Sequence, residues 1–187
     1  TREGGTRKLI DLYDETYKYI KAINTELDET SLRLLSNTVL TYSDLITNRN
    51  TDYKFDLEKF TNVNGKTGVY IQYANVRAQK LINDSLLEVS DFSILSKELD
   101  INDKSLLRSL IKFEFYFEQT IKNNEPHHLA DYLYEISQKF NGMYQGINIL
   151  ENENVVLKEN KLKITDLFLQ YSNLLMECLG ILPVKKM

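Results

Sequence analysis

The sequence predicts an all-α protein built as a helical bundle. Along nearly the whole chain of 187 residues, apolar side chains recur every three or four positions, which is the spacing of one helix face. Strand-like alternation of useful length is absent from the sequence, and only 7 glycines and 2 prolines interrupt the pattern. Hydrophobic residues make up 42% of the chain and charged residues 27%, which excludes a disordered protein and allows one sizeable core.

Two long helices are expected before residue 50. Apolar side chains line one helix face over residues 9–23 and another over residues 32–46. Asp28 or Thr30 would cap the second helix, because short polar side chains accept hydrogen bonds from the first free backbone N–H groups. Residues 48–52 are polar and form a connector.

A short helical piece over residues 55–60 and a glycine-containing loop over residues 64–68 come next. A third long helix is predicted over residues 69–87. The polar connectors gather between Asn48 and Gly68, which favours a boundary between two units in this stretch.

The next two helices follow Asp103 and the pair Glu125–Pro126, since proline suits the first turn of a helix. Their expected inward residues are Leu106, Leu110, Phe113, Phe117 and Ile121 in the first, and Leu129, Leu133, Ile136 and Phe140 in the second.

Residues 146–160 are predicted to be a polar loop with a short extended piece at Val155–Leu157. A last helix follows, and Gly180 stands where a left-handed stop is expected. The apolar face of this helix is predicted to carry Leu167, Tyr171, Leu174 and Cys178.

Composition limits the classes of function. The net charge of −4 excludes a globally basic nucleic-acid-binding protein, although it permits a local basic patch. No apolar run is long enough to span a membrane. The single cysteine cannot form an internal disulfide, which favours a reducing compartment and therefore a cytoplasmic protein. The chain begins at Thr1 without a leader, so we expect a segment of a longer protein.

Catalytic groups are scarce. Adjacent His127 and His128 should point about 100° apart on a helix, so they are expected to be surface residues that cannot share one metal ion. Cys178 is expected to be a buried, inert thiol. No pair of carboxylates stands out. These residues predict no metal site and no catalytic site, so an independent enzyme is disfavoured.

Aromatic residues are more informative, with 12 Tyr and 8 Phe. Tyr70, Tyr73 and Arg77 are three and four residues apart and so share one helix face. Tyrosine rings stack on unpaired bases, and arginine reaches phosphates or base edges. The same spacing also suits the edge of a core with a satisfied arginine, and both interpretations stay open. Phe140 and Tyr144 form a second such pair.

Three parts of the chain, its opening, its middle and its end, carry runs that are typical of one protein family and stand in the family's order. The runs TYSDLITNRNTDYKFDLEKF and NGKTGVYIQYANVR contain a Tyr-x-Gln-Tyr-Ala-x-x-Arg motif over Tyr70–Arg77. Near the end stand LADYLYEISQKFNGMYQGINIL and LGILPVKKM, and the chain opens on TREGGTRKLIDLYDE. Together these stretches resemble arginyl-tRNA synthetases, which are class I aminoacyl-tRNA ligases, over essentially the whole chain.

The resemblance implies two units. Residues 1–60 would be the C-terminal tail of the catalytic domain, and residues 61–187 the helical anticodon-binding domain of the DALR type found in class Ia synthetases. The parent protein would use ATP and magnesium to attach arginine to its tRNA in protein synthesis. Its catalytic motifs lie upstream, so this chain alone is expected to be inactive and to bind no cofactor.

The resemblance also implies site residues. Its pocket for an anticodon base, expected to be the central cytosine, would fall on Tyr70, Tyr73, Arg77, Tyr144 and Met187. The remnant of its ATP loop would comprise Thr1, Arg2, Gly4 and Gly5. The sequence departs from the family pattern at Asn75, where an aromatic residue or histidine is common, at Met143 and at Lys161.

The expected partners are the tRNA for arginine and the upstream catalytic domain. No membrane contact is expected, and the protein is expected to be a monomer. Without the upstream domain, an exposed apolar patch is expected between Leu9 and Ile23. The alternative function is an α-helical protein-interaction module whose aromatic stripe binds a partner helix.

Overall fold

The structure is a computed structural model that describes residues 8–85 and 99–187. All regular structure within these residues is helical, which confirms the predicted all-α fold. The helices are α1 (Leu9–Ile23), α2 (Glu29–Leu45), α3 (Leu57–Phe60), α4 (Gly68–Ser85), α5 (Ile101–Leu110), α6 (Phe113–Asn123), α7 (His127–Gln145) and α8 (Val155–Cys178). None of these helices is long and apolar enough to cross a membrane.

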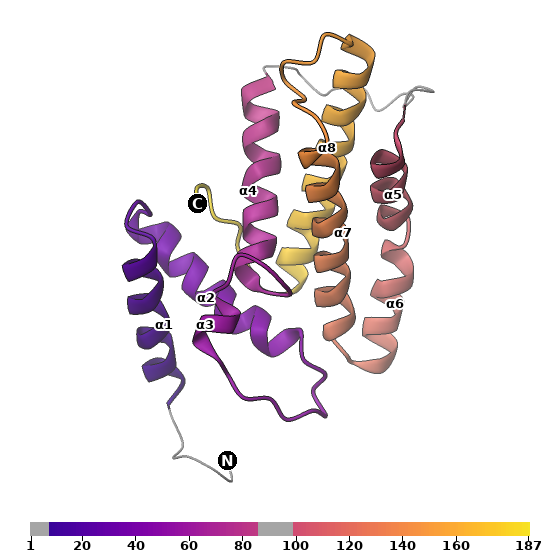
Figure 1. The fold of residues 1–187 in the computed structure, drawn as a ribbon. Helices are drawn as coiled ribbons and strands as arrows, with labels where there is room; N and C mark the ends of the chain where they lie inside the picture. The colour runs from indigo at the N-terminus through magenta and orange to yellow at the C-terminus, as the bar shows by residue number, and fades with distance from the viewer. Residues whose placement is uncertain (1–7, 86–98) are drawn as a thin grey trace.

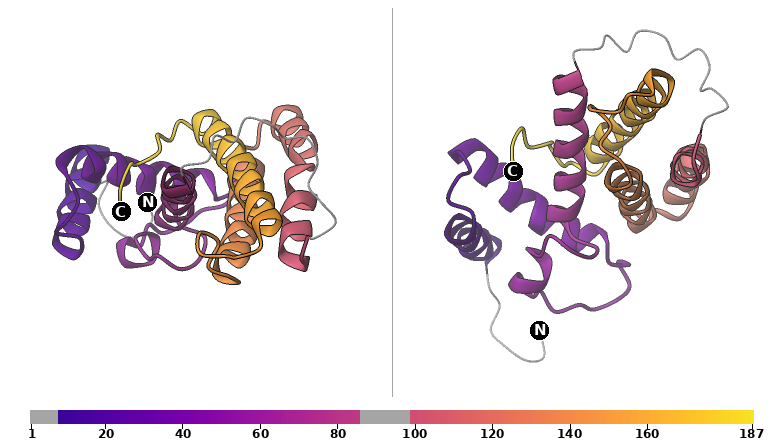
Figure 2. Two further views of the ribbon diagram at one scale, coloured as in Figure 1. Left: turned by 90° about the horizontal axis from the view of Figure 1, so that it is seen from above. Right: turned by 45° about the horizontal axis from the view of Figure 1, so that its top comes forward.

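Helices α4, α7, α8 and the α5–α6 pair form the body of the bundle and run side by side (Figure 1). Their core includes Phe140 of α7 stacked on Phe168 of α8, with ring centroids 4.3 Å apart. Helices α1 and α2 lie on the other side of α4 and share a second core with α3. The tail after α8 returns to the side of α4 that faces α2, so Val184 belongs to this second core (Figure 2).

Several predicted start and stop signals are confirmed. The Asp28 carboxylate caps α2 by accepting a hydrogen bond of 2.8 Å from the backbone N–H of Ser31. Gly65 and Gly180 have φ values of +92° and +69°, which a residue without a β-carbon adopts at little cost. Helix α7 starts directly after Pro126, and the four inward residues predicted for it are all buried.

The single helix predicted after Asp103 is wrong, because the chain turns between α5 and α6 at Ile111 and Lys112. The Tyr132 hydroxyl, from α7, lies 3.0 Å from the backbone oxygens of both Ser109 and Leu110 and can donate to either of them. This phenol therefore adds a side-chain donor at the end of α5, where Ser109 O already accepts from the Lys112 N–H. The turn also leaves Ile121, which was predicted to face inward, 60% exposed.

Two predictions for the last helix are also wrong. Val155–Leu157 is the first turn of α8 rather than an extended piece, because the Asn154 side chain accepts a hydrogen bond from the Leu157 N–H and caps the helix. Leu174 and Cys178 are exposed, so the thiol is not buried. The buried face of α8 instead runs through residues such as Phe168, Leu175 and Met176.

A buried ion cluster joins α8 to the start of α5. The Lys161 side chain is 1% exposed, and its Nζ lies 2.8 Å from Asp100 Oδ2 and 2.7 Å from Asp103 Oδ1. The two carboxylates also cap α5, since Asp100 accepts from the N–H of Asp103 and Asp103 accepts from the N–H of Asp100. One buried lysine therefore pairs with both carboxylates of a capping box, of which only Asp103 is buried.

This cluster predicts a loss of stability in acid. Burial raises the pKa of the Asp100 carboxyl. The hydrogen bonds from Lys161 and from backbone N–H groups lower it by more, so the pKa of Asp100 lies below its ordinary value. An aspartate with a lowered folded pKa stabilises the protein above its unfolded pKa of about 3.9, and that contribution disappears as the pH falls through the folded pKa. Urea denaturation between about pH 7 and pH 3 should therefore show a smaller acid loss for Asp100→Asn than for the wild type, since the amide still caps α5 without titrating. Parallel curves for the two proteins would contradict this expectation.

Candidate nucleic-acid interface

A guanidinium group lies between two tyrosine rings where α4 meets α7. The Arg77 guanidinium carbon is 4.0 Å from the ring centroid of Tyr73, one turn earlier on α4, and 5.4 Å from that of Tyr144 on α7. All three side chains are half-buried. The structure thus brings together three of the predicted site residues at the molecular surface, in an arrangement that favours cation–π contact.

Hydrogen bonds fix the plane of this guanidinium. Arg77 donates from Nη2 to the Tyr73 hydroxyl at 3.0 Å and from Nη1 to Oδ1 of buried Asn141 at 3.1 Å. A guanidinium carries five N–H donors, and these two bonds leave others for a ligand. No carboxylate in the described ranges forms a salt bridge with Arg77, so its charge is not neutralised by a neighbour there.

A hollow of about 390 Å³ opens beside Tyr144. Leu81, one turn beyond Arg77 on α4, forms part of its wall together with Gln145 and residues 147–150 of the loop after α7. The hollow has both polar and apolar walls, and its volume lies within the range of small ligand pockets.

The other two predicted residues, Tyr70 and Met187, have other contacts. The Tyr70 ring lies 5.2 Å from the ring of Tyr134 on α7, and Lys66 Nζ lies 5.9 Å from the Tyr134 ring. Met187 packs at the edge of the second core, as does Val76 of α4. The structure therefore places Tyr70 at one end of the α4–α7 surface and Met187 on the neighbouring side of α4.

The C-terminal tail is fixed to α4 by the residue before Tyr73. The fully buried Gln72 amide donates to Leu182 O at 2.8 Å and accepts from Val184 N–H at 3.0 Å. The same amide donates to the Thr38 hydroxyl of α2 at 2.8 Å. This amide positions the tail that carries Met187.

Sequence reasoning missed Asn141 and Tyr134. Both lie on α7, and with Tyr144 they are spaced by seven and three residues, so they share one face of that helix. That spacing could have indicated these two residues. Only the packing of α7 on α4, however, shows which face of α7 meets Arg77.

The three departures from the family pattern lie inside the protein. Asn75 is 2% exposed and donates to Ser172 Oγ at 3.1 Å and Asn173 Oδ1 at 2.9 Å, so it joins α4 to α8. Met143 belongs to the main core, and Lys161 to the buried ion cluster. Asn75 and Lys161 thus form buried polar contacts, and Met143 packs among apolar side chains. The predicted ATP-loop residues Thr1, Arg2, Gly4 and Gly5 lie outside the described residues.

His127 and His128 do not point about 100° apart as predicted. Their ring centroids lie 4.1 Å apart, because the side chains turn toward one another from the first turn of α7. Ring nitrogens of both residues and a carboxylate oxygen of Glu125 lie within 4.8 Å of one another. The angle between neighbouring Cα–Cβ bonds therefore does not determine where the nitrogens lie.

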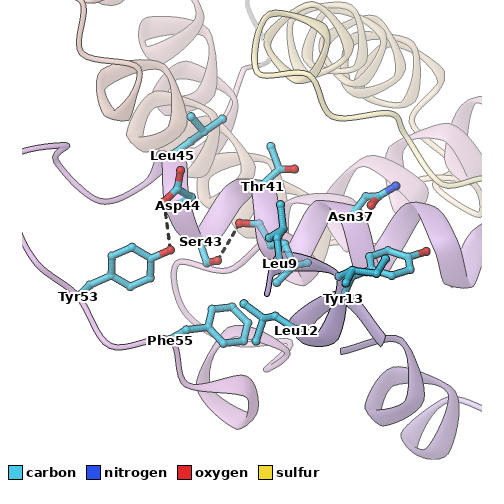
Figure 3. A pocket seen from close by; sticks show the side chains of 12 residues that line it. Leu9, Leu12, Tyr13, Asn37, Thr41, Ser43, Asp44, Leu45, Tyr53 and Phe55 are labelled. Atoms are coloured by element: carbon cyan, nitrogen blue, oxygen red, sulfur yellow. Dashed lines mark hydrogen bonds between the residues drawn. The ribbon is translucent and has the colours of Figure 1, made fainter. Parts of the chain in front are cut away.

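An apolar groove of about 780 Å³ lies between α1 and α2 (Figure 3). Leu9 and Tyr13 of α1 face it, and Tyr53 and Phe55 close one side. The Tyr53 hydroxyl donates to Asp44 at 3.2 Å, and burial, followed by the nearby Asp44 carboxylate, raises the pKa of this phenol. The exposed apolar patch predicted in this region is confirmed, with Leu9 73% exposed and Ile23 60% exposed.

Comparison with known proteins identifies the family of the chain. Residues 71–187 match the family model of the DALR anticodon binding domain. The arginine–tRNA ligase of Vibrio campbellii is 31% identical over the whole chain and that of Hamiltonella defensa is 34% identical, and in each case the match covers 34% of the relative. The chain thus spans about a third of the length of these relatives.

Solved structures agree. The arginyl-tRNA synthetase of Plasmodium falciparum is similar over 96% of this chain and 34% of its own, with a TM-score of 0.81 and 29% identity. The arginyl-tRNA synthetase of Thermus thermophilus shares the fold over 96% of this chain with a TM-score of 0.81 at 18% identity. Since the family model covers more than half of the sequence, the chain belongs to the DALR anticodon-binding domain family.

Proposed function

We propose that this chain is the tRNA-binding module of an arginine–tRNA ligase and that its α4–α7 surface binds the anticodon loop of the tRNA for arginine. The observation that carries the proposal is the Arg77 guanidinium between Tyr73 and Tyr144, with donors to spare and no carboxylate beside it in the described ranges. The family match favours this role over a helical protein-interaction module.

The geometry suits an unstacked base. Single-stranded loop bases stack on aromatic rings and are recognised by hydrogen bonds to their edges. Tyr70, Tyr73 and Tyr144 supply rings at the surface, and Arg77 supplies donors to base oxygen and nitrogen atoms. The base expected here is the central cytosine of the anticodon, with Met187 as an apolar wall on the adjoining side of α4.

The intact parent would activate arginine with ATP and magnesium and transfer it to the tRNA, working as a cytoplasmic monomer. That chemistry would come from an upstream catalytic domain, so this chain alone would be inactive. Residues 1–60 would form the tail of that domain and residues 61–187 the anticodon-binding domain. The groove of Figure 3 is then the surface on which the upstream domain packs, since its apolar wall is exposed in this chain.

Titration with RNA tests the proposal. A stem-loop carrying an arginine anticodon should bind more tightly than the same stem with the central cytosine replaced. Its affinity should fall as salt rises, because phosphate contacts release counterions. Fluorescence anisotropy at several salt concentrations measures both effects. Equal affinity for the two loops, or no binding to either, would contradict the proposal.

A further inference from the structure

We propose that Glu125, His127 and His128, in the turn between α6 and α7, form a binding site for one divalent transition-metal ion. One ligand atom from each residue lies within 4.8 Å of the other two. All three side chains are half-buried, so the group is shielded yet reachable from solvent. The site is separate from the Arg77 cluster and does not depend on the RNA-binding proposal.

The closest pair already has the spacing of metal ligands. His128 Nε2 lies 3.1 Å from Glu125 Oε2. Zinc bonds of about 2.0–2.1 Å in a tetrahedron place neighbouring ligand atoms roughly 3.3 Å apart. The third ligand, from His127, must close by at most about 1.5 Å to reach this geometry, and rotation of a histidine ring covers that distance.

The His127 side chain gives independent support for a metal site. Its Nδ1 atom is buried and makes no hydrogen bond, whereas buried polar atoms are normally paired because an unpaired one costs free energy. Its ring centroid lies 4.1 Å from that of His128, with the planes tilted by 36°. Coordination of a cation would give this imidazole the partner that the protein does not provide.

The surrounding chain fixes the ligands. Asn124 adopts a left-handed conformation with φ of 53°, which ends α6, and Pro126 restricts the backbone between Glu125 and the two histidines. Asn48 Nδ2 lies 3.5 Å from Glu125 Oε1 and can orient the second carboxylate oxygen, as outer partners of metal ligands do. The N-terminus of α7 opposes a cation, and the negative charge of Glu125 offsets that effect.

The donor set selects the class of metal. Two imidazoles and one carboxylate suit Zn²⁺, Co²⁺ or Ni²⁺, whereas Mg²⁺ and Ca²⁺ prefer oxygen ligands only. Three protein ligands leave a fourth position for water or for a group from a partner. The ion would tie the end of α6 to the start of α7.

The chain allows a clean experiment, because it contains only two histidines and one cysteine. Zn²⁺ is titrated calorimetrically into the 187-residue chain carrying Cys178→Ser, which removes the exposed thiol. We expect one ion per chain, with no comparable binding of Mg²⁺. His127→Gln, His128→Gln and Glu125→Gln should each weaken Zn²⁺ binding at least tenfold, whereas Glu118→Gln, an exposed acid on α6, should leave it unchanged. Circular dichroism confirms that each variant is folded.

A measurement on the unmutated ligands keeps the test independent of folding effects. In the NMR spectrum of the histidine ring nitrogens, one equivalent of Zn²⁺ should shift the resonances of both imidazoles together. No saturable binding, a shift of only one ring, or full affinity after either histidine is replaced would overturn the site.

Discussion

Replacing Lys161 with methionine is expected to lower the free energy of unfolding by about 3–5 kcal/mol. The substitution keeps an unbranched side chain one atom shorter but leaves the Asp103 carboxylate, which is 1% exposed, without its cation. A buried charge without a partner is strongly destabilising, because it has lost its hydration and gained nothing in return. Asp100, whose side chain is 46% exposed, can recover solvent contact and should contribute less to the loss.

Urea denaturation followed by circular dichroism measures this loss of stability. Two further variants test whether the loss comes from the unpaired carboxylate. Lys163→Met, two residues along α8, removes a lysine for which no partner is seen among the described residues and should change stability by no more than about 0.5 kcal/mol. Lys161→Met combined with Asp103→Asn removes the stranded charge while retaining an acceptor for the Asp100 N–H, so it should be more stable than Lys161→Met alone. If Lys161→Met unfolds at the wild-type urea concentration, the cluster does not contribute as described.

Replacing Arg77 with alanine is expected to weaken binding of the arginine anticodon stem-loop by about 1–3 kcal/mol, or roughly 5- to 150-fold. The change removes the donors and the cation that lie between Tyr73 and Tyr144. It also leaves the buried Asn141 oxygen without its donor, which should lower protein stability by about 1 kcal/mol. Binding should therefore change while the bundle stays folded.

Matched variants separate this role from general charge attraction. Lys80→Ala removes an exposed positive charge from the same helix and should weaken binding much less. Arg77→Lys keeps the charge but loses the planar group that stacks on Tyr73, so it should resemble Arg77→Ala more than the wild type. The proposed site is wrong if Lys80→Ala and Arg77→Ala weaken binding equally, or if neither does.

Local pattern predicted the fold where one side of a helix is mostly apolar. Helix α7 is such a case, and its start at Pro126 and inward face at Leu129, Leu133, Ile136 and Phe140 are confirmed. Apolar spacing gave wrong predictions where a helix contacts polar groups from distant parts of the chain. At the break after α5, the last carbonyl groups meet the Tyr132 hydroxyl, which lies 22 and 23 residues further along the chain than its two partners. On α8, the interior accepts Lys161 and Thr165, so the buried face differs from the one that apolar spacing indicates.

Some residues of the candidate site could likewise be predicted from local spacing, and others could not. Tyr73 and Arg77 were found from their separation on one helix, because residues four apart meet whatever the rest of the fold does. The contribution of Asn141 depends on how α7 packs against α4, which no local rule gives. The meeting of Glu125, His127 and His128 was missed because rotamers, rather than backbone positions, bring their ligand atoms together.

The Gln72 amide has a consequence for the order of folding. It joins groups 34, 110 and 112 residues apart along the sequence, and the last two separations are the longest among the side-chain hydrogen bonds of the described residues. Closing such a loop costs conformational entropy before any contact repays it, so α2 and α4 must already be assembled when the tail docks. We therefore expect the tail that carries Val184 and Met187 to dock late in folding.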